Sequence, residues 1–216
     1  GTNGGRVSVK SIKIINDHIY LGGIFTHFKG NGASWTYARN GARLDINGKP
    51  DRSWNPEFNG TVIDIDVDEN EAYYYAAGYF TRAHNRVVEN AGRLSTAAGA
   101  ELDQSWTFRH SYLIGKYQQT VTAANGRVYF GGSQHSLFGY NSDSMTRTSG
   151  SITMNNGGDL QASTRSATGV VYASCHCSDF TFQDAYQYLT LGTAWTRADE
   201  IQWVGGWDEA TGSQLG

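Results

Sequence analysis

Alternating acidic side chains offer the first chemistry that this sequence could perform. An acid or amide occupies every second position at Asp64, Asp66, Asp68 and Asn70. Calcium is a hard cation that takes several oxygen ligands, so this set at the end of a strand is a candidate calcium site. It departs from an EF-hand loop, because Glu69 stands where the sharp turn needs glycine. The alternative is a strand whose acids face water while the apolar residues between them point inward.

The only two cysteines stand on either side of a histidine, as Cys175, His176 and Cys177. These are soft metal ligands, but a tetrahedral zinc site needs four ligands and the sequence shows no second pair. Strand alternation would put both thiols on one face and the imidazole on the other. We therefore expect either a disulfide between the two cysteines or two buried thiols, in preference to a metal site.

A third group of side chains could bind a ligand at the rim of the fold. Trp35 and Tyr37 lie in a long loop, and a loop aromatic is suited to stacking on a sugar ring or a partner protein. His27 and His84 each follow a Phe-Thr pair at equivalent places in the chain, so they could face the same rim. The alternatives are that Trp35 folds over its own blade and that the histidines are ordinary polar loop residues.

No catalytic motif accompanies these residues. The sequence has no Gly-x-Ser-x-Gly, no His-Glu-x-x-His and no phosphate-binding glycine loop. Paired acids for glycoside hydrolysis depend on a separation in space that sequence does not give. We predict a protein that is not an enzyme, and keep a hydrolase or an oxidase as the alternative.

Composition restricts the class of protein and its partners. The formal net charge is −3 and no cluster of lysine and arginine is present, so nucleic-acid binding is not expected. No apolar run of about 18 residues occurs, so we expect no membrane span. With 27 Gly, 2 Pro and 13% aromatic residues in 216, the chain fits many short strands joined by tight turns.

An internal repeat supplies the elements that must position these side chains. Three segments each occur twice: 19–26 and 74–81, 40–44 and 90–94, 51–54 and 103–106. The offsets of 55, 50 and 52 residues keep the copies collinear. A period of about 50 residues made of strands and glycine turns is typical of a β-propeller. Trp54 and Trp106 stand at equivalent positions, so we expect them to pack between blades.

Each repeat is expected to form a four-stranded antiparallel blade, so the fold class is an all-β, propeller-like array. Two weaker copies follow the first two, which gives about four units in one domain and leaves open a larger ring. Glycines at the end of the second strand suit a crowded ring centre, where backbones approach closely. The predicted domain and its units are 1–216, divided into 1–58, 59–110, 111–158 and 159–216.

The motifs of the first two units resemble a known family. They read Tyr-Leu-Gly-Gly-x-Phe-Thr, then Ala-Arg-Leu-Asp, then Gly-Lys-Pro-Asp-x-Ser-Trp-Asn-Pro. This series is similar to the delta-60 type propeller-like repeat of secreted actinobacterial proteins and of minor tail proteins of actinobacterial phages. The family is often labelled by analogy with galactose-oxidase or kelch propellers. The resemblance implies an extracellular or virion-surface location and an adhesive or structural role, and it brings no catalytic motif.

We therefore expect part of a phage minor tail protein that binds a glycan or protein of the host cell surface and contacts neighbouring subunits. The loops 26–39, 82–89 and 178–200 would carry the contacts. Calcium is the only cofactor with a candidate site. The alternatives are a secreted actinobacterial propeller enzyme and a purely structural spacer. The ligand-binding candidates are Trp35, Tyr37, His27 and His84.

Overall fold

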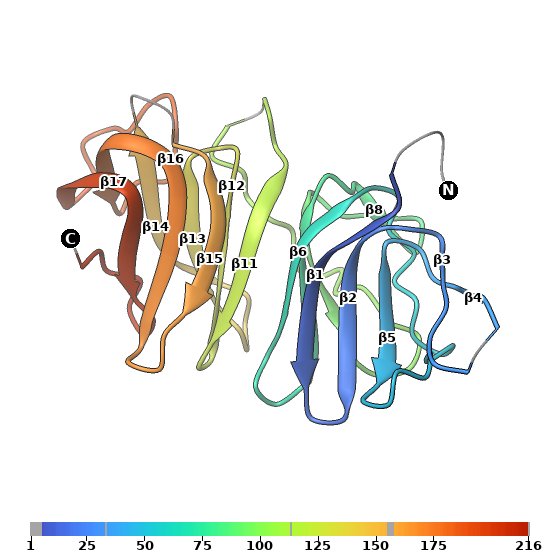
Figure 1. Cartoon of the computed structure of the whole chain (residues 1–216). Helices are drawn as coiled ribbons and strands as arrows, with labels where there is room; N and C mark the ends of the chain where they lie inside the picture. The colour runs from blue at the N-terminus through green and yellow to red at the C-terminus, as the bar shows by residue number, and fades with distance from the viewer. Residues whose placement is uncertain (1–5, 33, 113, 155–157, 216) are drawn as a thin grey trace. The chain divides into compact units, whose positions relative to one another are not determined.

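The computed structural model describes residues 6–32, 34–112, 114–154 and 158–215. Throughout these ranges the regular structure is antiparallel β-strand, as Figure 1 shows, and no helix long and apolar enough to cross a membrane occurs in them. The chain forms two compact units, Gly1–Phe108 and Arg109–Gly216. The boundary between them lies close to the predicted end of the second repeat at residue 110. The all-β class is confirmed.

The first unit contains two three-stranded antiparallel sheets, which we call blade 1 and blade 2. Figure 1 shows the strands of blade 1 side by side, with a short turn between the first two. In sheet order the strands are β1 (Ser8–Ile15), β2 (His18–Ile24) and β5 (Gly41–Asp45) in blade 1, and β6 (Val62–Val67), β7 (Tyr73–Gly78) and β10 (Ala91–Ser95) in blade 2.

The predicted fourth strand is wrong for these two blades. The fourth segment makes only an isolated bridge in each, Leu44 to Pro50 and Leu94 to Leu102. An Asp-x-Ser turn follows each bridge, and the residues directly beyond it form no strand of the blade's sheet. Each blade also carries a two-stranded hairpin after its second strand, formed by β3 (His27–Phe28) with β4 (Thr36–Tyr37) and by β8 (Arg82–Ala83) with β9 (Arg86–Val87).

The repeated glycines at the end of the second strand face a bulge in the first strand. The pairing of β1 with β2 shifts register after Val9, and β6 and β7 show the same shift. A Cβ at Gly23 would collide with the backbone carbonyl oxygen of Ser8, and one at Gly78 with that of Thr61. Backbones therefore approach closely at these glycines, as predicted, but the approaching backbone is the bulged first strand of the same blade.

A repeated arginine–aspartate corner joins the third strand of each blade to its fourth segment. Arg43 donates from Nε and Nη2 to Oδ2 of Asp51, at 2.9 and 2.6 Å. The other carboxylate oxygen of Asp51 accepts from the backbone N and Oγ of Ser53. Burial would raise the pKa of Asp51, but the hydrogen bonds from Ser53 and Arg43 outweigh it and lower that pKa. Blade 2 repeats the corner with Arg93, Asp103 and Ser105.

Trp54 follows this corner and is buried between the two blades, as predicted. Its ring centroid lies 5.5 Å from that of Tyr20 in blade 1 and 4.8 Å from that of Tyr74 in blade 2. Its Nε1 donates to the backbone carbonyl oxygen of Ser95 at 3.0 Å. Trp106, the repeat counterpart, is only half-buried. Trp54 is thus the apolar centre of the seam between blades 1 and 2.

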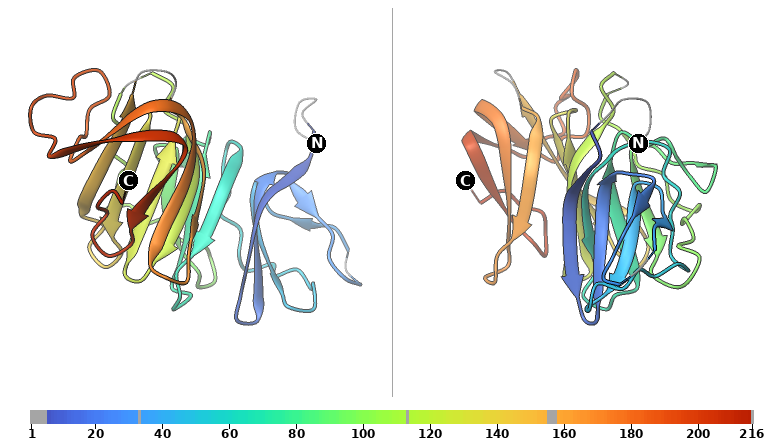
Figure 2. Two further views of the ribbon diagram at one scale, coloured as in Figure 1. Left: turned by 60° about the vertical axis from the view of Figure 1, so that its left-hand side comes forward. Right: turned by 45° about the vertical axis from the view of Figure 1, so that its right-hand side comes forward.

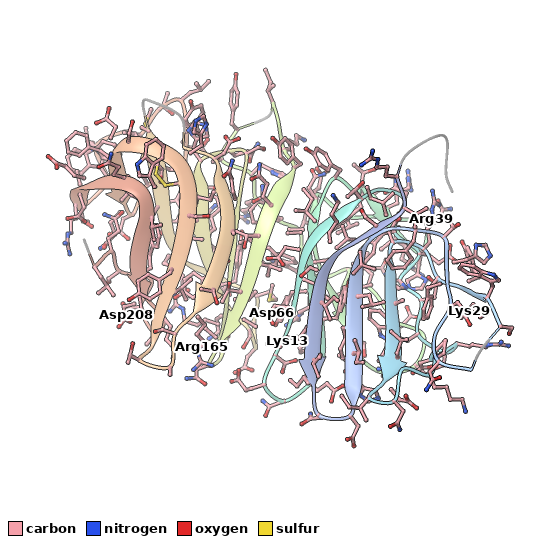
Figure 3. The ribbon with its side chains drawn as sticks, in the orientation of Figure 1. Lys13, Lys29, Arg39, Asp66, Arg165 and Asp208 are labelled. Atoms are coloured by element: carbon pink, nitrogen blue, oxygen red, sulfur yellow. A yellow bond between two sulfur atoms is a disulfide. The ribbon has the colours of Figure 1, made fainter. Side chains whose placement is uncertain are left out.

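Polar contacts line one side of the same seam. Glu71, in the turn between β6 and β7, accepts hydrogen bonds from Asn16 Nδ2 and Tyr20 OH of blade 1, both at 2.8 Å, and its Oε1 contacts His18 Nδ1. Burial would raise the pKa of Glu71, but these hydrogen bonds lower it. Figure 3 labels a second contact of this kind, the ion pair between Lys13 and Asp66 at 3.0 Å.

The second unit is one continuous curled sheet. Its strand order is β11-β12-β13-β14-β16-β15, and β17 pairs with β16 away from this path. The first four strands form the four-stranded antiparallel blade that the repeat predicts. The strands are β11 (Gln118–Ala124), β12 (Arg127–Gly132), β13 (Ser136–Asn141), β14 (Arg147–Met154), β15 (Leu160–Arg165), β16 (Val170–Gln183) and β17 (Arg197–Asp208).

The long strand β16 makes this sheet continuous. Its first half pairs with β15 and its last four residues pair with β14, while β17 follows it along most of its length. Figure 2 shows β16 and β17 arching together. Thr120 and Thr122 of β11 each hydrogen-bond to Ser163 of β15 at 2.6 Å, which brings the ends of the strand order together. The predicted rim loop 178–200 is wrong at both ends, because these strands extend into it.

Cys175 and Cys177 form a disulfide on β16. Both are buried in the core of the second unit, whereas His176 between them is exposed, as strand alternation predicts. The register of β16 with β17 shifts between Ser174 and Ser178, so the disulfide lies within a bulge. The sequence left open a disulfide or two buried thiols, and the structure contains the disulfide.

Replacing Trp54 by alanine is expected to destabilise the first unit by about 3–5 kcal/mol, because it removes a fully buried ring. Trp106→Ala, at the half-buried equivalent position, is the matched control and should cost clearly less. Urea unfolding followed by far-UV circular dichroism measures both. Equal losses would contradict a special role for Trp54 in the seam.

Glu71→Gln is expected to lower the melting temperature in a pH-dependent way. Because the folded-state pKa of Glu71 is lowered, its contribution is present above the ordinary value of 4.5 and is lost as the pH falls through the folded-state pKa. The difference between wild type and variant should therefore be largest near neutral pH and shrink in acid. Glu69→Gln, at an exposed neighbouring position, is the control. A loss that stays constant with pH would refute this assignment.

Candidate functional site

The hairpin of β3 and β4 brings together three of the four predicted ligand-binding residues. His27 pairs with Tyr37 across the hairpin, and their ring centroids lie 5.3 Å apart. Trp35 directly precedes β4. The side chains of Trp35 and Tyr37 are 68% and 46% exposed, and His27 is exposed too. Trp35 therefore does not fold over its blade, and we call this set the aromatic face.

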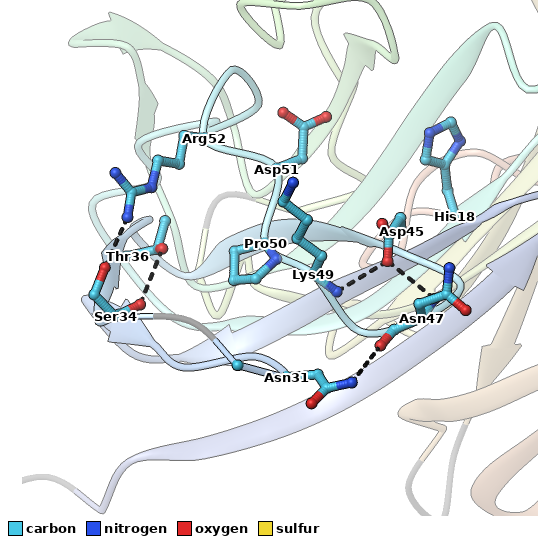
Figure 4. A pocket seen from close by; sticks show the side chains of 11 residues that line it. His18, Asn31, Ser34, Thr36, Asp45, Asn47, Lys49, Pro50, Asp51 and Arg52 are labelled. Atoms are coloured by element: carbon cyan, nitrogen blue, oxygen red, sulfur yellow. Dashed lines mark hydrogen bonds between the residues drawn. The ribbon is translucent and has the colours of Figure 1, made fainter.

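The opposite side of the hairpin borders a cleft of about 960 Å³. Ser34 and Thr36 line it, and they alternate with Trp35 and Tyr37 along the chain. The aromatic face is therefore a separate surface from the cleft. Figure 4 shows the lining side chains, which are mostly polar. The lining comprises His18, Asn31, Gly32, Ser34, Thr36, Asp45, Asn47, Lys49, Pro50, Asp51 and Arg52.

The two aspartates that line this cleft accept hydrogen bonds from nearby residues of blade 1. Asp45 Oδ1 accepts from the backbone N of Asn47 and of Lys49, each at 2.9 Å, as Figure 4 shows. Asp51 belongs to the arginine–aspartate corner, and its pKa is lowered. A glycosidase needs a carboxylic acid whose pKa is raised so that it can donate a proton. Asp51 is shifted in the other direction and is a poor general acid.

Two polar residues support the aromatic face from the fourth segment of blade 1. Tyr37 OH donates to Oε2 of Glu57 at 3.1 Å, and Glu57 Oε1 accepts from Asn55 Nδ2 at 3.1 Å. Partial burial and then Glu57 raise the pKa of Tyr37, so the phenol stays neutral and directed at the carboxylate. Sequence reasoning missed Glu57 and Asn55. The sequence signal for both is their place just beyond the repeated corner, since Asn55 follows Trp54 and Glu57 comes two residues later.

The structure places His84 apart from these three residues. It lies in the turn of the β8–β9 hairpin of blade 2, with a left-handed φ of 47°. The ring Nε2 lies 2.9 Å from the backbone carbonyl oxygen of Ala100 and donates to it. His84 thus occupies the equivalent hairpin, as the repeat predicts, but its ring supports a loop of its own blade.

The three aspartates of the predicted calcium site each have partners within the protein. Asp64 accepts from Ser11 Oγ at 2.8 Å, and Asp66 pairs with Lys13. Asp68 Oδ1 accepts from two backbone N–H groups of its own turn, those of residues 72 and 73. Asn70 lies exposed in that turn. In the part of the chain that the structure describes, no group of three His, Cys, Asp or Glu side chains could hold a metal ion.

Comparison with known proteins shows the fold. The sequence matches no family model and no curated protein. Solved structures that it resembles include the computationally designed Ika8 protein, at 8% identity and a TM-score of 0.52 over 99% of this chain and 62% of that one. The Cps50 (Swd1) β-propeller domain of Myceliophteria thermophila is 8% identical, with a TM-score of 0.54 over 96% of this chain and 72% of that domain. The RRP9 WD40 repeats are 8% identical, with a TM-score of 0.53 over 99% of this chain and 64% of that one.

These similarities confirm the propeller-like fold predicted from the repeat. The chain spans 62% of the length of the designed protein, 64% of the RRP9 repeats and 72% of the Cps50 domain. At 8% identity they carry no information on ligand or activity.

Millimolar calcium is expected to leave the melting temperature unchanged relative to chelator, because Asp64, Asp66 and Asp68 are already engaged by groups of the protein. Differential scanning calorimetry in the two buffers measures this. A saturable rise with calcium that Asp66→Asn removes would restore the calcium site instead.

Proposed function

We propose that this protein is an interaction module that binds a surface glycan through the aromatic face of its β3–β4 hairpin. The observation that carries the proposal is the exposure of Trp35 and Tyr37 on a hairpin whose position the fold fixes. Large aromatic side chains are normally buried, so two exposed rings on one short hairpin favour a binding surface. The pairing of β3 with β4 and the hydrogen bond from Tyr37 to Glu57 hold the hairpin in place, which limits the entropy that binding would cost.

The chemistry of the aromatic face suits a sugar. A pyranose presents an apolar C–H face, which stacks on an aromatic ring, and hydroxyl groups at its edge, which need polar partners. His27 and Glu57 lie beside Tyr37 and can exchange hydrogen bonds with such hydroxyls. The aromatic face is thus amphipathic in the way that a carbohydrate requires.

The resemblance to the delta-60 type repeat supports a setting for this activity. We place the protein at an extracellular or virion surface, as part of a phage minor tail protein that contacts a host cell-surface glycan. Neighbouring subunits of the same assembly are further partners. A secreted actinobacterial location is the second setting that the same resemblance supports.

A propeller enzyme and a structural spacer are the competing functions. The lowered pKa of Asp51 in the cleft beside the β3–β4 hairpin disfavours acid-catalysed glycoside hydrolysis there. A spacer needs no exposed aromatic pair, so Trp35 and Tyr37 favour binding over spacing.

Substituting Trp35 or Tyr37 by alanine is expected to weaken binding to isolated actinobacterial wall polysaccharide by about three- to tenfold each, the usual value of one aromatic contact. Sedimentation with intact cells and titration with the soluble polysaccharide measure it. Tyr79→Ala removes an aromatic ring of blade 2 that is 53% exposed and serves as the matched control.

Saturable binding that all three variants retain would place the ligand elsewhere on the protein. A folded wild-type chain that binds neither cells nor polysaccharide would leave the spacer function.

A further inference from the structure

Blade 1 carries a row of exposed aliphatic side chains on its first strand. Ile12 and Ile14 of β1 are each 60% exposed, and Val9 is 47% exposed. Alternation places Ile12 and Ile14 on one face of the strand, and their cross-strand partners Leu21 and Ile19 continue that face on β2. Leu21 and Ile19 belong to a buried cluster, so the exposed part of this face is the row Val9, Ile12 and Ile14 on β1. An exposed apolar row of this kind marks a contact surface. We call it the β1 face.

The internal repeat identifies what this face corresponds to. Ile12 and Ile14 align with Ile65 and Val67 of β6, and Val9 aligns with Val62, since both strands shift register after that valine. In blade 2 the three equivalents are buried, with exposures of 5%, 2% and 0% in the same order. They belong to the core between the two blades. The β1 face is therefore the blade 1 equivalent of the surface by which blade 2 docks on blade 1, and in blade 1 these three side chains are exposed.

The surface that receives blade 2 is equally well defined. Gly22 of blade 1 lies against Ile65 and Val62, and a Cβ there would come within 2.6 and 2.7 Å of their side chains. Trp54 and Phe58 cover the rest of the contact. Phe58 packs against Phe80 of blade 2 with tilted rings whose centroids lie 4.5 Å apart.

Hydrogen bonds align the two blades at this seam. Tyr74 OH donates to the backbone carbonyl oxygen of Leu21 at 3.1 Å. Arg43 donates from Nη1 to the carbonyl oxygen of Thr96 in blade 2. A receiving blade is thus recognised by a small residue on its second strand, a tryptophan after an Asp-x-Ser turn, and an arginine on its third strand.

We propose that the β1 face docks a further β-blade of this same repeat type. The docked blade would contact Val9, Ile12 and Ile14 with its own receiving surface. That surface is equivalent to the one that Gly22, Trp54 and Phe58 of blade 1 form against blade 2. A symmetric contact between the β1 faces of two copies offers only aliphatic side chains and lacks the tryptophan and the close-packed glycine. The repeat geometry therefore favours a blade over a second β1 face.

The test adds such a blade to the whole chain. A copy of residues 6–60 is placed directly before Ser8, which reproduces the natural junction between blades 1 and 2, because Gly60 and Thr61 align with Val7 and Ser8. Amide hydrogen exchange then compares residues 8–15 of the original blade 1 with and without the added copy. We expect exchange there to slow by about tenfold or more, since the strand becomes part of a buried seam.

Paired variants make the result specific. Ile12→Asp with Ile14→Asp in the original blade 1 should abolish the protection in the extended chain. The same pair in the unextended chain should leave its melting temperature nearly unchanged, whereas Ile65→Asp with Val67→Asp should lower it strongly.

Several outcomes would overturn the proposal. One is an added blade that leaves exchange of residues 8–15 unchanged, whether or not its own amides are protected. Another is destabilisation of the unextended chain by the Ile12 and Ile14 substitutions as great as that from Ile65 and Val67. Self-association of the unextended chain in light scattering, lost on those Ile12 and Ile14 substitutions, would assign the β1 face to a second copy.

Discussion

The seam between blades 1 and 2 is the constraint on which the first unit depends. Each blade is a small sheet with one apolar face, and such a sheet is marginal until that face is covered. Trp54 of blade 1 covers the apolar face of blade 2, and Arg43 holds the fourth segment so that Trp54 reaches that blade. On the polar side of the seam, Glu71 of blade 2 accepts a hydrogen bond from Tyr20 of blade 1. The corner, the tryptophan and the turn glutamate thus act together.

The same architecture leaves the hairpins free to vary. The β3–β4 and β8–β9 hairpins leave the blades at equivalent places. The first carries the exposed rings of Trp35 and Tyr37, whereas the second has no tryptophan or tyrosine. Neither ring belongs to the core of the seam, so both can change without disturbing it. A fixed scaffold with a variable edge is how a repeat fold acquires binding specificity.

Much of the fold could be predicted from the sequence because the repeat is local and periodic. The glycines of the second strand, the burial of Trp54 and the facing of Cys175 and Cys177 all follow from strand alternation and from the spacing of the copies. Contacts between turns could not be predicted. The roles of Glu71 and Glu57 depend on left-handed backbone conformations, with φ of 52° and 53°, that direct each carboxylate toward another element. No pattern in the sequence specifies such directions.

Binding at the aromatic face can be mapped by an NMR titration of the isotopically labelled chain with soluble wall-polysaccharide fragments. We expect backbone amide shifts confined to residues 26–39 and 55–57, together with a shift of the Trp35 indole signal. Shifts centred on the cleft residues Asp45 to Arg52 with an unmoved Trp35 indole, or on the second unit, would contradict binding at the aromatic face.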